Sequence, residues 1–507
     1  MTPAELARRL ERSFAVLAAG PRGAVAHHQT LRATIDWSFQ LLTGPEQQLL
    51  ARLAVFAGGS TLEAAEAVCS GDGIDASAVF GLLASLVARS LVMAEEHRQQ
   101  TRYRLLETIR QYGEEHLEAA GETERWRARH TRYYVGLLQQ IRDYARDPNP
   151  EVFWAVRLSA EQDNLLAAWS WALRTGNVGT AFQMLAGFAP AEVWTSYQLL
   201  LNGETALELP GAAEHPGYPL AAAVSALFAS IRGDVTGTKQ LCRRAAEANA
   251  RRDTPDWRVE ETICAARQNI AMTAGAFADA ARLDGQAADI ARAGGDLADT
   301  SVLLNIAVGG HALAGDAPAA AAPLAREALA LARQVGAPAL IARSLLAVGA
   351  TAARTDPDQA RACLRESRKL STALGYQSPT DLNWATAIAF LVGDQAATLE
   401  FGHRIIRALQ PGRDRRLMGF NLHWIAGTLA ATRPEAAATI QGAAETYVAK
   451  MPMSDDLISS AATAALGEER ARELRARGAD MDWAQAVAYT LTQATQALSE
   501  LPSETQP

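Results

Sequence analysis

Small residues recur at a nearly constant interval in the second half of this 507-residue chain. Successive members are 40, 38 and 40 positions apart: Gly309, Gly349, Ala387 and Gly427. Six positions after each member comes a predicted turn, at Gly315, Thr355, Gly393 and Arg433. Two earlier turns, at Gly275 and Gly233, extend the series by a further 40 and 42 positions. A period near 40 that contains two helical stretches and a turn is typical of an α-solenoid.

The residue types at these positions fit that architecture. A small side chain in a helix lets a neighbouring helix approach closely, and a turn glycine accepts a left-handed backbone. An acid follows three of the turns, at Asp316, Asp356 and Asp394. We therefore expect repeats of about 40 residues over residues 201–450. Such arrays present surfaces that bind other molecules, and they seldom carry out chemistry.

Composition agrees with a helical protein. Alanine, leucine and arginine are abundant and favour helices, while aromatic residues make up only 6% of the chain. The length exceeds what one hydrophobic core supports, so several domains are expected. The net charge of −8 argues against a general affinity for nucleic acid.

The sequence lacks the features of a membrane-bound or secreted protein. No run of 18 uninterrupted apolar residues occurs, so no membrane span is expected. Residues 1–20 form an amphipathic pattern without the apolar stretch of a signal peptide. The four cysteines are far apart, and we expect them to be buried and reduced rather than disulfide-bonded or metal-bound: Cys69, Cys242, Cys264 and Cys363. A cytoplasmic protein is therefore expected.

The first quarter of the chain has a different pattern. After an N-terminal helix over residues 1–26, helical spacing of apolar residues predicts helices over 29–42, 46–56, 61–68 and 75–89. Ser60 or Thr61 is expected to cap the third of these, with Glu63 placed for a capping box. Two short strands at 90–94 and 102–105 and a helix over 107–119 complete the series. Helices followed by a small hairpin predict a winged-helix domain over residues 27–120.

The remaining chain is expected to be helical. Residues 121–200 form a connector, residues 201–450 hold the repeats, and residues 451–507 contain terminal helices and a polar tail. The expected fold class is all-α: a winged-helix domain with one small β-hairpin, followed by an α-solenoid.

Four segments of the first 120 residues resemble known regulators. They are residues 28–38 (HQTLRATIDWS), 53–59 (LAVFAGG), 86–92 (LVARSLV) and 103–112 (YRLLETIRQY). In this order they resemble the winged-helix domain of STAND regulators. These are signal-transducing NTPases related to the maltose-regulon activator and to LuxR-type and cyclase-linked actinobacterial regulators. Residues 161–165 (EQDNL) resemble the segment that leads into the TPR-like array of that family.

The resemblance implies a winged-helix regulatory arm followed by a TPR-like array, without the NTPase domain of the family. Residues 1–26 resemble only the last helix of that nucleotide-binding domain. None of the three lysines, Lys239, Lys369 and Lys450, fits the G-x-x-x-x-G-K-[ST] loop that holds phosphates. We therefore expect no ATP binding or hydrolysis by this chain. Residues 481–488 resemble the end of the family's sensor region, and no LuxR-type DNA-binding domain is expected after them.

Two interpretations of the winged helix are open. A DNA-binding interpretation uses the arginines of the hairpin, Arg98, Arg102 and Arg104. The alternative is an internal packing module whose hairpin is simply solvated. Residues 1–135 hold 15 arginines and 16 acidic residues, and direct readout needs a cationic helix in the major groove. The second interpretation is therefore preferred, and DNA is not expected as a partner.

A column of polar and aromatic residues marks a candidate partner groove in the array. Ten or nine positions before three of the four turns lie Asn305, Asn383, Trp384, His423 and Trp424, while Leu345 takes this place in the remaining repeat. Asparagine bonds peptide groups in both directions, and tryptophan supplies contact area. The alternative is that the tryptophans pack between helices.

No pattern for chemistry stands out. His27–His28 is the only histidine pair, and the sequence has neither an H-E-x-x-H nor a G-x-S-x-G motif. No catalytic, cofactor-binding or metal-binding residue is therefore assigned. We expect a non-enzymatic sensor or regulatory protein that binds a protein, a peptide or a small-molecule inducer. The alternatives are a DNA-binding transcriptional regulator, or part of a nucleotide-dependent switch whose NTPase or cyclase is a separate chain.

Overall fold

The computed structural model describes residues 32–97, 100–144, 160–187, 203–314, 318–375, 377–409, 415–448 and 455–501. In these ranges the chain is helical apart from one two-stranded antiparallel sheet, which confirms the predicted fold class. The predicted helix over residues 1–26, together with Arg98, lies outside the described residues. The chain forms two compact units, Met1–Leu137 with Ser159–Asn177 and Leu138–Leu158 with Val178–Pro507.

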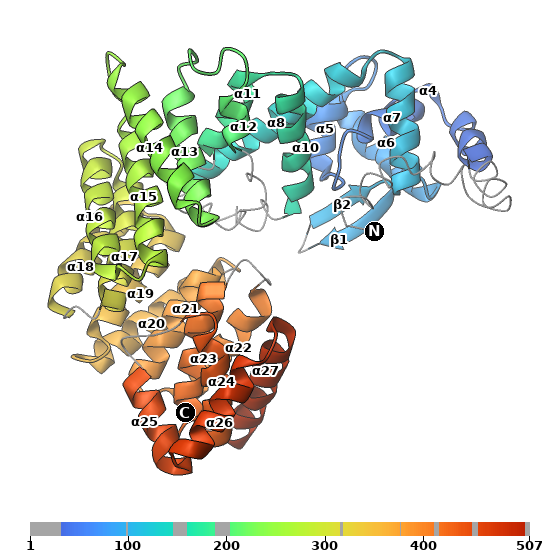
Figure 1. Cartoon of the computed structure of the whole chain (residues 1–507). Helices are drawn as coiled ribbons and strands as arrows, with labels where there is room; N and C mark the ends of the chain where they lie inside the picture. Colours follow the sequence, from blue (N-terminus) through green and yellow to red (C-terminus); the bar gives the residue numbers. More distant parts are fainter. Residues whose placement is uncertain are drawn as a thin grey trace. The chain divides into compact units, whose positions relative to one another are not determined.

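The first unit consists of short helices and the hairpin (Figure 1). Residues 32–40 are helical. The elements that follow are α4 (Gly44–Leu53), α5 (Leu62–Cys69), α6 (Ala76–Ala88), β1 (Met93–His97), β2 (Gln100–Arg104), α7 (Glu107–Ala119), α8 (Thr123–Tyr144) and α10 (Gln162–Arg174). Helix α8 belongs to this unit up to Leu137. The order of three helices and a hairpin, from α4 to β2, is that of a winged helix.

Side-chain caps fix where the first helices begin. The Thr43 amide donates to Glu46 Oε2 at 2.7 Å, which closes a capping box at α4. Thr61 caps α5 by accepting from the Ala64 amide at 3.2 Å, which leaves Glu63 one position short of a capping box. Ser60 instead pairs with Tyr103 of the hairpin through two backbone hydrogen bonds.

The hairpin begins later than the sequence predicts. The predicted first strand covers residues 90–94, but β1 begins at Met93. Ser90 has a φ of 59°, and the amides of Leu91 and Val92 both donate back to the Leu86 carbonyl. These residues therefore complete the end of α6, so the strand pairing with β2 starts only after them. Residues between the two predicted strands also belong to the hairpin, since β1 continues to His97 and β2 begins at Gln100.

A buried arginine joins three helices of this unit. Arg52 in α4 is 3% exposed and donates to the carbonyls of Cys69, Gly71 and Asp72 at 2.7–3.0 Å. Its guanidinium carbon lies 4.1 Å from the centre of the Trp126 ring in α8. The contacts satisfy the end of α5 and stack the cation on an aromatic face.

The second unit is a series of helix pairs. Its elements are α11 (Val178–Gly187), α12 (Gly203–Leu207), α13 (Tyr218–Ile231), α14 (Val235–Ala250), α15 (Trp257–Thr273), α16 (Phe277–Ala293), α17 (Leu297–Ala314), α18 (Pro318–Val335), α19 (Pro338–Ala352), α20 (Pro357–Ala373), α21 (Pro379–Leu391), α22 (Gln395–Ala408), α23 (Arg415–Leu429), α24 (Pro434–Glu445), α25 (Asp455–Leu466), α26 (Glu468–Ala479) and α27 (Trp483–Glu500).

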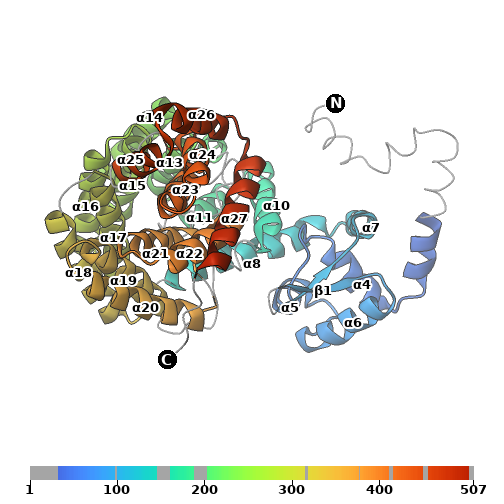
Figure 2. The same ribbon diagram turned by 90° about the horizontal axis from the view of Figure 1, so that it is seen from below.

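Pairing in this unit follows the predicted period. The first helices of successive pairs, from α13 to α23, begin 39, 40, 41, 41 and 36 residues apart. From α11 to α26 each helix contacts the next one along the chain, and α13 with α15, α17 with α19, α19 with α21 and α21 with α23 also touch. Figures 1 and 2 show the pairs following one another along a curved path. The described residues of this unit therefore form an α-solenoid.

The glycine and aspartate residues of the turns adopt the conformations and make the caps that are typical of these residue types. Gly233 and Gly393 adopt φ values of 80° and 77°, a region that favours glycine. The aspartate after each glycine caps the next helix, since Asp234 accepts from the Gly237 amide at 2.8 Å and Asp394 from the Ala397 amide at 2.9 Å. A glycine to end one helix and an aspartate to begin the next make each turn short.

Small residues also mark helix crossings. A Cβ on Gly349 would lie 3.3 Å from Cys363 Cβ and from Ile388 Cδ1, and one on Gly309 would lie 3.0 Å from the Trp384 ring. A still closer crossing joins α24 and α26, where a Cβ on Gly442 would meet the Arg475 carbonyl and one on Gly478 the Thr439 carbonyl. None of the helices in the described parts of the chain is long and apolar enough to cross a membrane.

Candidate functional site

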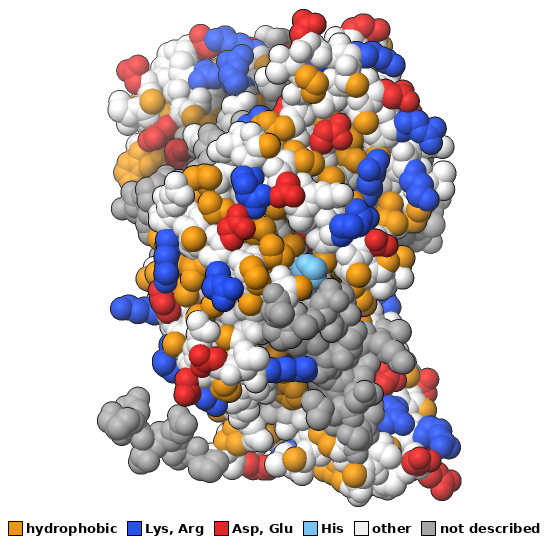
Figure 3. All heavy atoms as spheres, turned by 90° about the vertical axis from the view of Figure 1, so that its left-hand side faces the viewer, with side chains coloured by type: hydrophobic (Ala, Val, Ile, Leu, Met, Phe, Trp, Pro, Cys, Tyr) orange, Lys and Arg blue, Asp and Glu red, His pale blue; other side chains and the backbone are white. Residues whose placement is uncertain are grey.

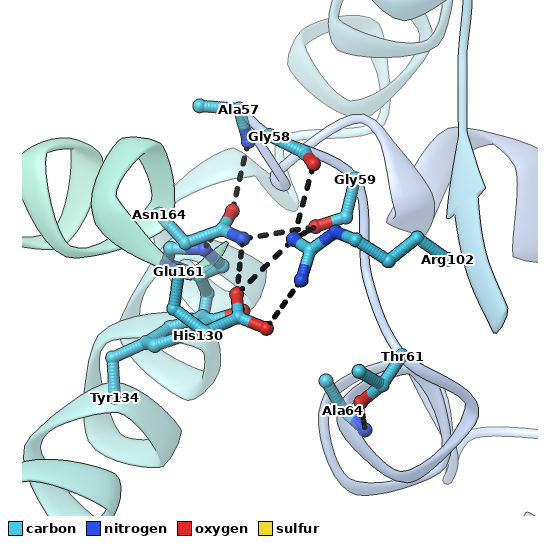
Figure 4. Close-up of polar contacts among 10 residues, drawn as sticks. All are labelled: Ala57, Gly58, Gly59, Thr61, Ala64, Arg102, His130, Tyr134, Glu161 and Asn164. Atoms are coloured by element: carbon cyan, nitrogen blue, oxygen red, sulfur yellow. Dashed lines mark hydrogen bonds and ion pairs between the residues drawn. The ribbon is translucent and has the colours of Figure 1, made fainter. Parts of the chain in front are cut away.

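A buried ion pair lies at the base of the hairpin. Arg102 in β2 and Glu161 at the start of α10 are 7% and 2% exposed. The Arg102 guanidinium contacts the Glu161 carboxylate with an Nη1–Oε1 distance of 2.7 Å and an Nη2–Oε2 distance of 3.3 Å. Nη2 also donates to the carbonyls of Gly58 and Gly59, each at 3.1 Å. Figure 4 shows this pair between the loop that precedes α5 and α10.

Three further side chains complete the cluster. The Tyr134 hydroxyl of α8 and the Asn164 amide of α10 each donate to Glu161 Oε2 at 2.8 Å. Asn164 also accepts from the Ala57 amide at 3.0 Å and donates to the Gly59 carbonyl at 2.9 Å. His130 Nε2 of α8 lies 3.3 Å from Asn164 Oδ1. We call these five side chains, Arg102, His130, Tyr134, Glu161 and Asn164, the wing-base cluster (Figure 4).

Burial and nearby charges shift the pKa values of three groups of the cluster, Arg102, Tyr134 and His130. Burial lowers the pKa of Arg102, but its hydrogen bond and charge contact with Glu161 outweigh this, and the pKa lies above its usual value. Burial, followed by the Glu161 charge, raises the pKa of Tyr134 well above its usual value. Burial lowers the pKa of His130 to about 4. At neutral pH the cluster therefore contains one ion pair, a neutral imidazole and a protonated phenol.

The chemistry of the wing-base cluster is structural rather than catalytic. The cation and the anion satisfy each other, and the Asn164 amide and the Tyr134 hydroxyl donate to remaining lone pairs of the carboxylate. The cluster contains no thiol or aliphatic hydroxyl that could act as a nucleophile. The contacts of the cluster reach β2, the loop before α5, and the helices α8 and α10. The cluster therefore fixes the hairpin to α8 and α10. The resemblance at residues 161–165 marks this segment, but the sequence does not reveal its pairing with Arg102.

The other two hairpin arginines differ from Arg102. Arg98 lies outside the described residues. Arg104 is exposed, and its Nη1 lies 3.7 Å from Glu95 Oε2 on the paired strand. The buried side chain of Arg102 is directed toward Glu161 and not toward solvent.

Helix α6 occupies the place of the third helix of the winged helix, which reads DNA in helix-turn-helix proteins. Its sequence, ASAVFGLLASLVA, contains no charged residue. Phe80 is 56% exposed on this helix, and its other exposed residues are alanine, serine and glycine. Residues 42–118 as a whole contain eleven acidic residues and six arginines. The exposed face of α6 is therefore apolar and uncharged.

The predicted groove residues of the array lie at different depths. Asn305 is buried, and its Nδ2 donates to Ser344 Oγ at 3.0 Å. His423 and Trp424 are also buried, and the Trp424 ring centre lies 5.2 Å from that of Phe390.

The remaining two groove residues, Asn383 and Trp384, are half-buried, and the Trp384 ring faces Gly309. Most of these contacts are made between neighbouring helices of the array. The assignment of the column to a partner groove stays a prediction.

The described parts of the chain contain no candidate metal site and no candidate reactive cysteine. No group of three or more histidine, cysteine, aspartate or glutamate side chains there could hold a metal ion. All four cysteines are free and buried, as predicted. Burial raises the pKa of Cys69 to about 12 and that of Cys264 to about 11, which keeps both thiols protonated and unreactive.

Comparison with known protein families identifies the type of domain in the first unit. Residues 42–118 match a family described as the winged helix-turn-helix domain. This range runs from the start of α4 through α7, and it agrees with the geometry of the first unit.

Particular relatives are mycobacterial. The chain is 41% identical over 203 residues to the “Putative HTH-type transcriptional regulator Rv0890c” of Mycobacterium tuberculosis, which covers 40% of this chain and 22% of that protein. It is 40% identical over 143 residues to the uncharacterized protein Rv0894 of the same species, which covers 28% of this chain and 36% of that protein. The chain therefore spans less than a quarter of the first relative and about a third of the second.

A solved structure that aligns with this chain is the STAND protein PH0952 from Pyrococcus horikoshii, described as having a tetratricopeptide repeat sensor. The similarity covers 98% of this chain and 70% of that one, at 16% sequence identity and a TM-score of 0.43.

Proposed function

We propose that this protein is a non-enzymatic regulator whose winged-helix domain contacts protein and whose helical array binds the molecule that is sensed. A regulatory role is supported by the winged-helix match and by the names of the mycobacterial relatives. The array supports recognition because stacked repeats present an extended surface. The wing-base cluster, whose groups satisfy one another, supports a structural rather than a catalytic role for the first unit.

The exposed face of α6 carries this proposal. A helix that reads DNA brings cationic and hydrogen-bonding side chains to base edges and phosphates. Helix α6 instead presents Phe80 among small side chains, without a basic residue. An exposed aromatic side chain on an uncharged surface suits a protein partner. The buried Arg102 supports the same interpretation, since one of the three hairpin arginines is taken up by Glu161.

DNA-binding transcriptional regulation is the second candidate. The helix-turn-helix match and the relatives' names favour it. In this case Arg104, Arg98 and Arg89 would have to supply the phosphate contacts around an acidic domain. Affinity would then depend strongly on salt, because each phosphate contact releases counterions.

The experiment that separates the two candidates measures binding of the full chain to DNA. Fluorescence anisotropy with pooled duplexes, followed by selection from a random-sequence library, is carried out at about 50 and 200 mM salt. We expect no selected sequence and no complex with a Kd below about 10⁻⁸ M at physiological salt. A selected motif whose binding is lost in Arg98→Ala/Arg104→Ala, but kept in the control Arg368→Ala, would establish the second candidate instead.

A positive test of the protein-contacting module uses Phe80. Phe80→Ser should leave the fold intact, because the side chain is exposed, and it should abolish capture of the partner that the wild-type chain retains. Val79→Ser is the contrasting variant, since Val79 is fully buried and its loss should unfold the domain. Capture that is unchanged in Phe80→Ser would remove the role proposed for α6.

A further inference from the structure

A cavity of about 650 Å³ opens in the array between α14, α15 and α16. Its floor is made by buried side chains, among them Thr238 and Cys242 of α14 and Leu283 of α16. Alanines with small side chains also line the cavity, Ala246 of α14 and Ala271 of α15 among them. None of the residues predicted from the sequence column lies here. The volume falls within the range of about 300–1,000 Å³ that is usual for small-molecule sites.

Basic side chains surround the opening. Lys239 and Arg243 of α14, Arg267 of α15 and Arg282 of α16 line the cavity, and the acidic residues there are Glu247 and Asp279. Four cations therefore face two anions in a chain whose net charge is −8. Figure 3 views the side of the molecule on which α14, α16 and α18 lie, and there lysine and arginine side chains stand among hydrophobic ones.

The four cations differ in how far their charge is satisfied. Arg282 lies 3.4 Å from Asp279 in the same helix, a contact that is worth little at an exposed site. Burial raises the pKa of the Cys242 thiol, and the positive charge of the neighbouring Arg267 opposes this shift. Lys239 and Arg243 are exposed and form no ion pair with any residue that the structure describes. Charge that could meet a ligand is thus concentrated on the α14 side of the opening.

We infer that this cavity binds a small amphipathic anion, with an apolar chain on the floor and a carboxylate or phosphate head at Lys239 and Arg243. The inference rests on the proposed function, because it gives the sensing array a ligand of defined chemistry. The apolar floor favours a hydrocarbon body. Guanidinium and ammonium groups form charge-assisted hydrogen bonds with carboxylates and phosphates.

The position of the cavity gives the ligand a mechanical effect. Helices α14 and α16 are the second helices of two successive pairs, and α15 lies between them as the first helix of its pair. A molecule that contacts all three helices fixes the spacing of neighbouring repeats. In a solenoid each repeat contacts only its neighbours, so such a change passes along the array.

The test uses the full chain and four probes that share a ten-carbon tail, at concentrations below micelle formation. Decanoate and decyl phosphate carry the two anionic heads, decanol is uncharged, and decyltrimethylammonium is cationic. Isothermal titration should give one-to-one binding of at least one anion, about tenfold or more tighter than that of decanol. The head group that binds better identifies the carboxylate or the phosphate as the recognised group.

Variants locate the binding. Lys239→Gln/Arg243→Gln should weaken the anion about tenfold or more and leave decanol unchanged. Lys369→Gln is the matched control, because Lys369 is also an exposed lysine of the array, on α20. Ala246→Trp should abolish binding by filling the cavity from a half-buried position, with circular dichroism to verify the fold.

Three outcomes would overturn the inference: no anion binds, decanol or the cation binds equally well, or Lys239→Gln/Arg243→Gln binds like Lys369→Gln. The proposed function is judged by DNA selection and partner capture, so it can stand when the cavity fails.

Discussion

Arg102 and Glu161 form a buried ion pair at 2.7 Å although 59 positions separate them in the sequence. The contact joins the hairpin of the winged helix to the start of α10, and Tyr134 extends it to α8. The hairpin, which in a DNA-binding winged helix is free to contact phosphates, is here fastened to the helices that follow it. The wing-base cluster therefore connects the hairpin to α8 and α10.

Removing the Arg102 cation from this pair should destabilise the fold. Arg102→Met leaves the Glu161 carboxylate buried without its partner, and we expect a loss of about 3–5 kcal/mol in the free energy of unfolding. The control is Arg104→Met, because Arg104 lies on the same strand but is exposed, and its pair with Glu95 should contribute less than about 1 kcal/mol. Urea unfolding followed by circular dichroism measures both.

A double variant separates charge from packing. Arg102→Met combined with Glu161→Gln removes both charges and keeps an acceptor for Tyr134, so it should be more stable than Arg102→Met alone. A double variant as unstable as the sum of the two single changes would mean that the two side chains act independently.

The buried imidazole of His130 predicts a loss of stability in mild acid. Its pKa is lowered to about 4 by burial, whereas an unfolded histidine titrates near 6.5. The unfolded chain therefore takes up a proton first, and stability that is present above about pH 6.5 falls as the pH is lowered toward 4. His130→Gln, which keeps a polar contact with Asn164 but does not titrate, should lose less stability between pH 7 and pH 5. An identical pH profile for the two proteins would show that His130 is not buried in its neutral form.

The array and the winged helix could be predicted from the sequence because local rules determine them. Helix spacing, turn glycines such as Gly233 and Gly393, and the aspartates after them act over a few residues. Position in the period is also enough to single out Gly349, which lies at a crossing of α19, α20 and α21.

What the sequence could not predict depends on partners distant along the chain. Arg102 has the polar neighbours of an exposed hairpin residue, and only the folded chain brings Glu161 to it. The polar type of Asn305 suggests a surface position, but Ser344 of the next pair supplies a partner inside the array. The cavity between α14 and α16 follows from the shape left by small side chains, which no periodicity records.

Buried acids in the array predict the opposite pH dependence to His130. Burial raises the pKa of Asp284 to about 8, far above that of an unfolded aspartate. The unfolded chain therefore releases this proton at lower pH, and stability falls as the pH rises from about 4 toward 8. Gln268 Nε2 donates to Asp284 Oδ2 at 3.3 Å, while Gln268 Oε1 is buried and has no hydrogen-bond partner among the residues that the structure describes. A protonated Asp284 can donate to that oxygen and pair with both ends of the amide.

Asp284→Asn tests this pairing directly. The variant is neutral at every pH and keeps a donor for Gln268 Oε1, so it should be more stable than the wild type at pH 8 by at least about 1 kcal/mol. The advantage should shrink as the pH is lowered toward 4. Asp289→Asn, at an exposed position of the same helix, controls for the effect of asparagine on helix propensity. Destabilisation by Asp284→Asn at pH 8 would mean that the carboxylate is ionised in the folded array.

The glycine positions of the array allow a sharper test of how its helices pack. Gly349→Leu should lower the free energy of unfolding by about 1–3 kcal/mol, because the new side chain meets Cys363 and Ile388 at a crossing with little room. Gly285→Ala in α16 is the matched control. A Cβ there meets nothing within 4 Å, and alanine favours a helix over glycine by roughly 0.5–1 kcal/mol. The two changes should therefore shift the urea midpoint in opposite directions. If both stabilised the chain, the small residues of the period would reflect helix composition alone, and the close approach of α19 to α20 and α21 would be wrong.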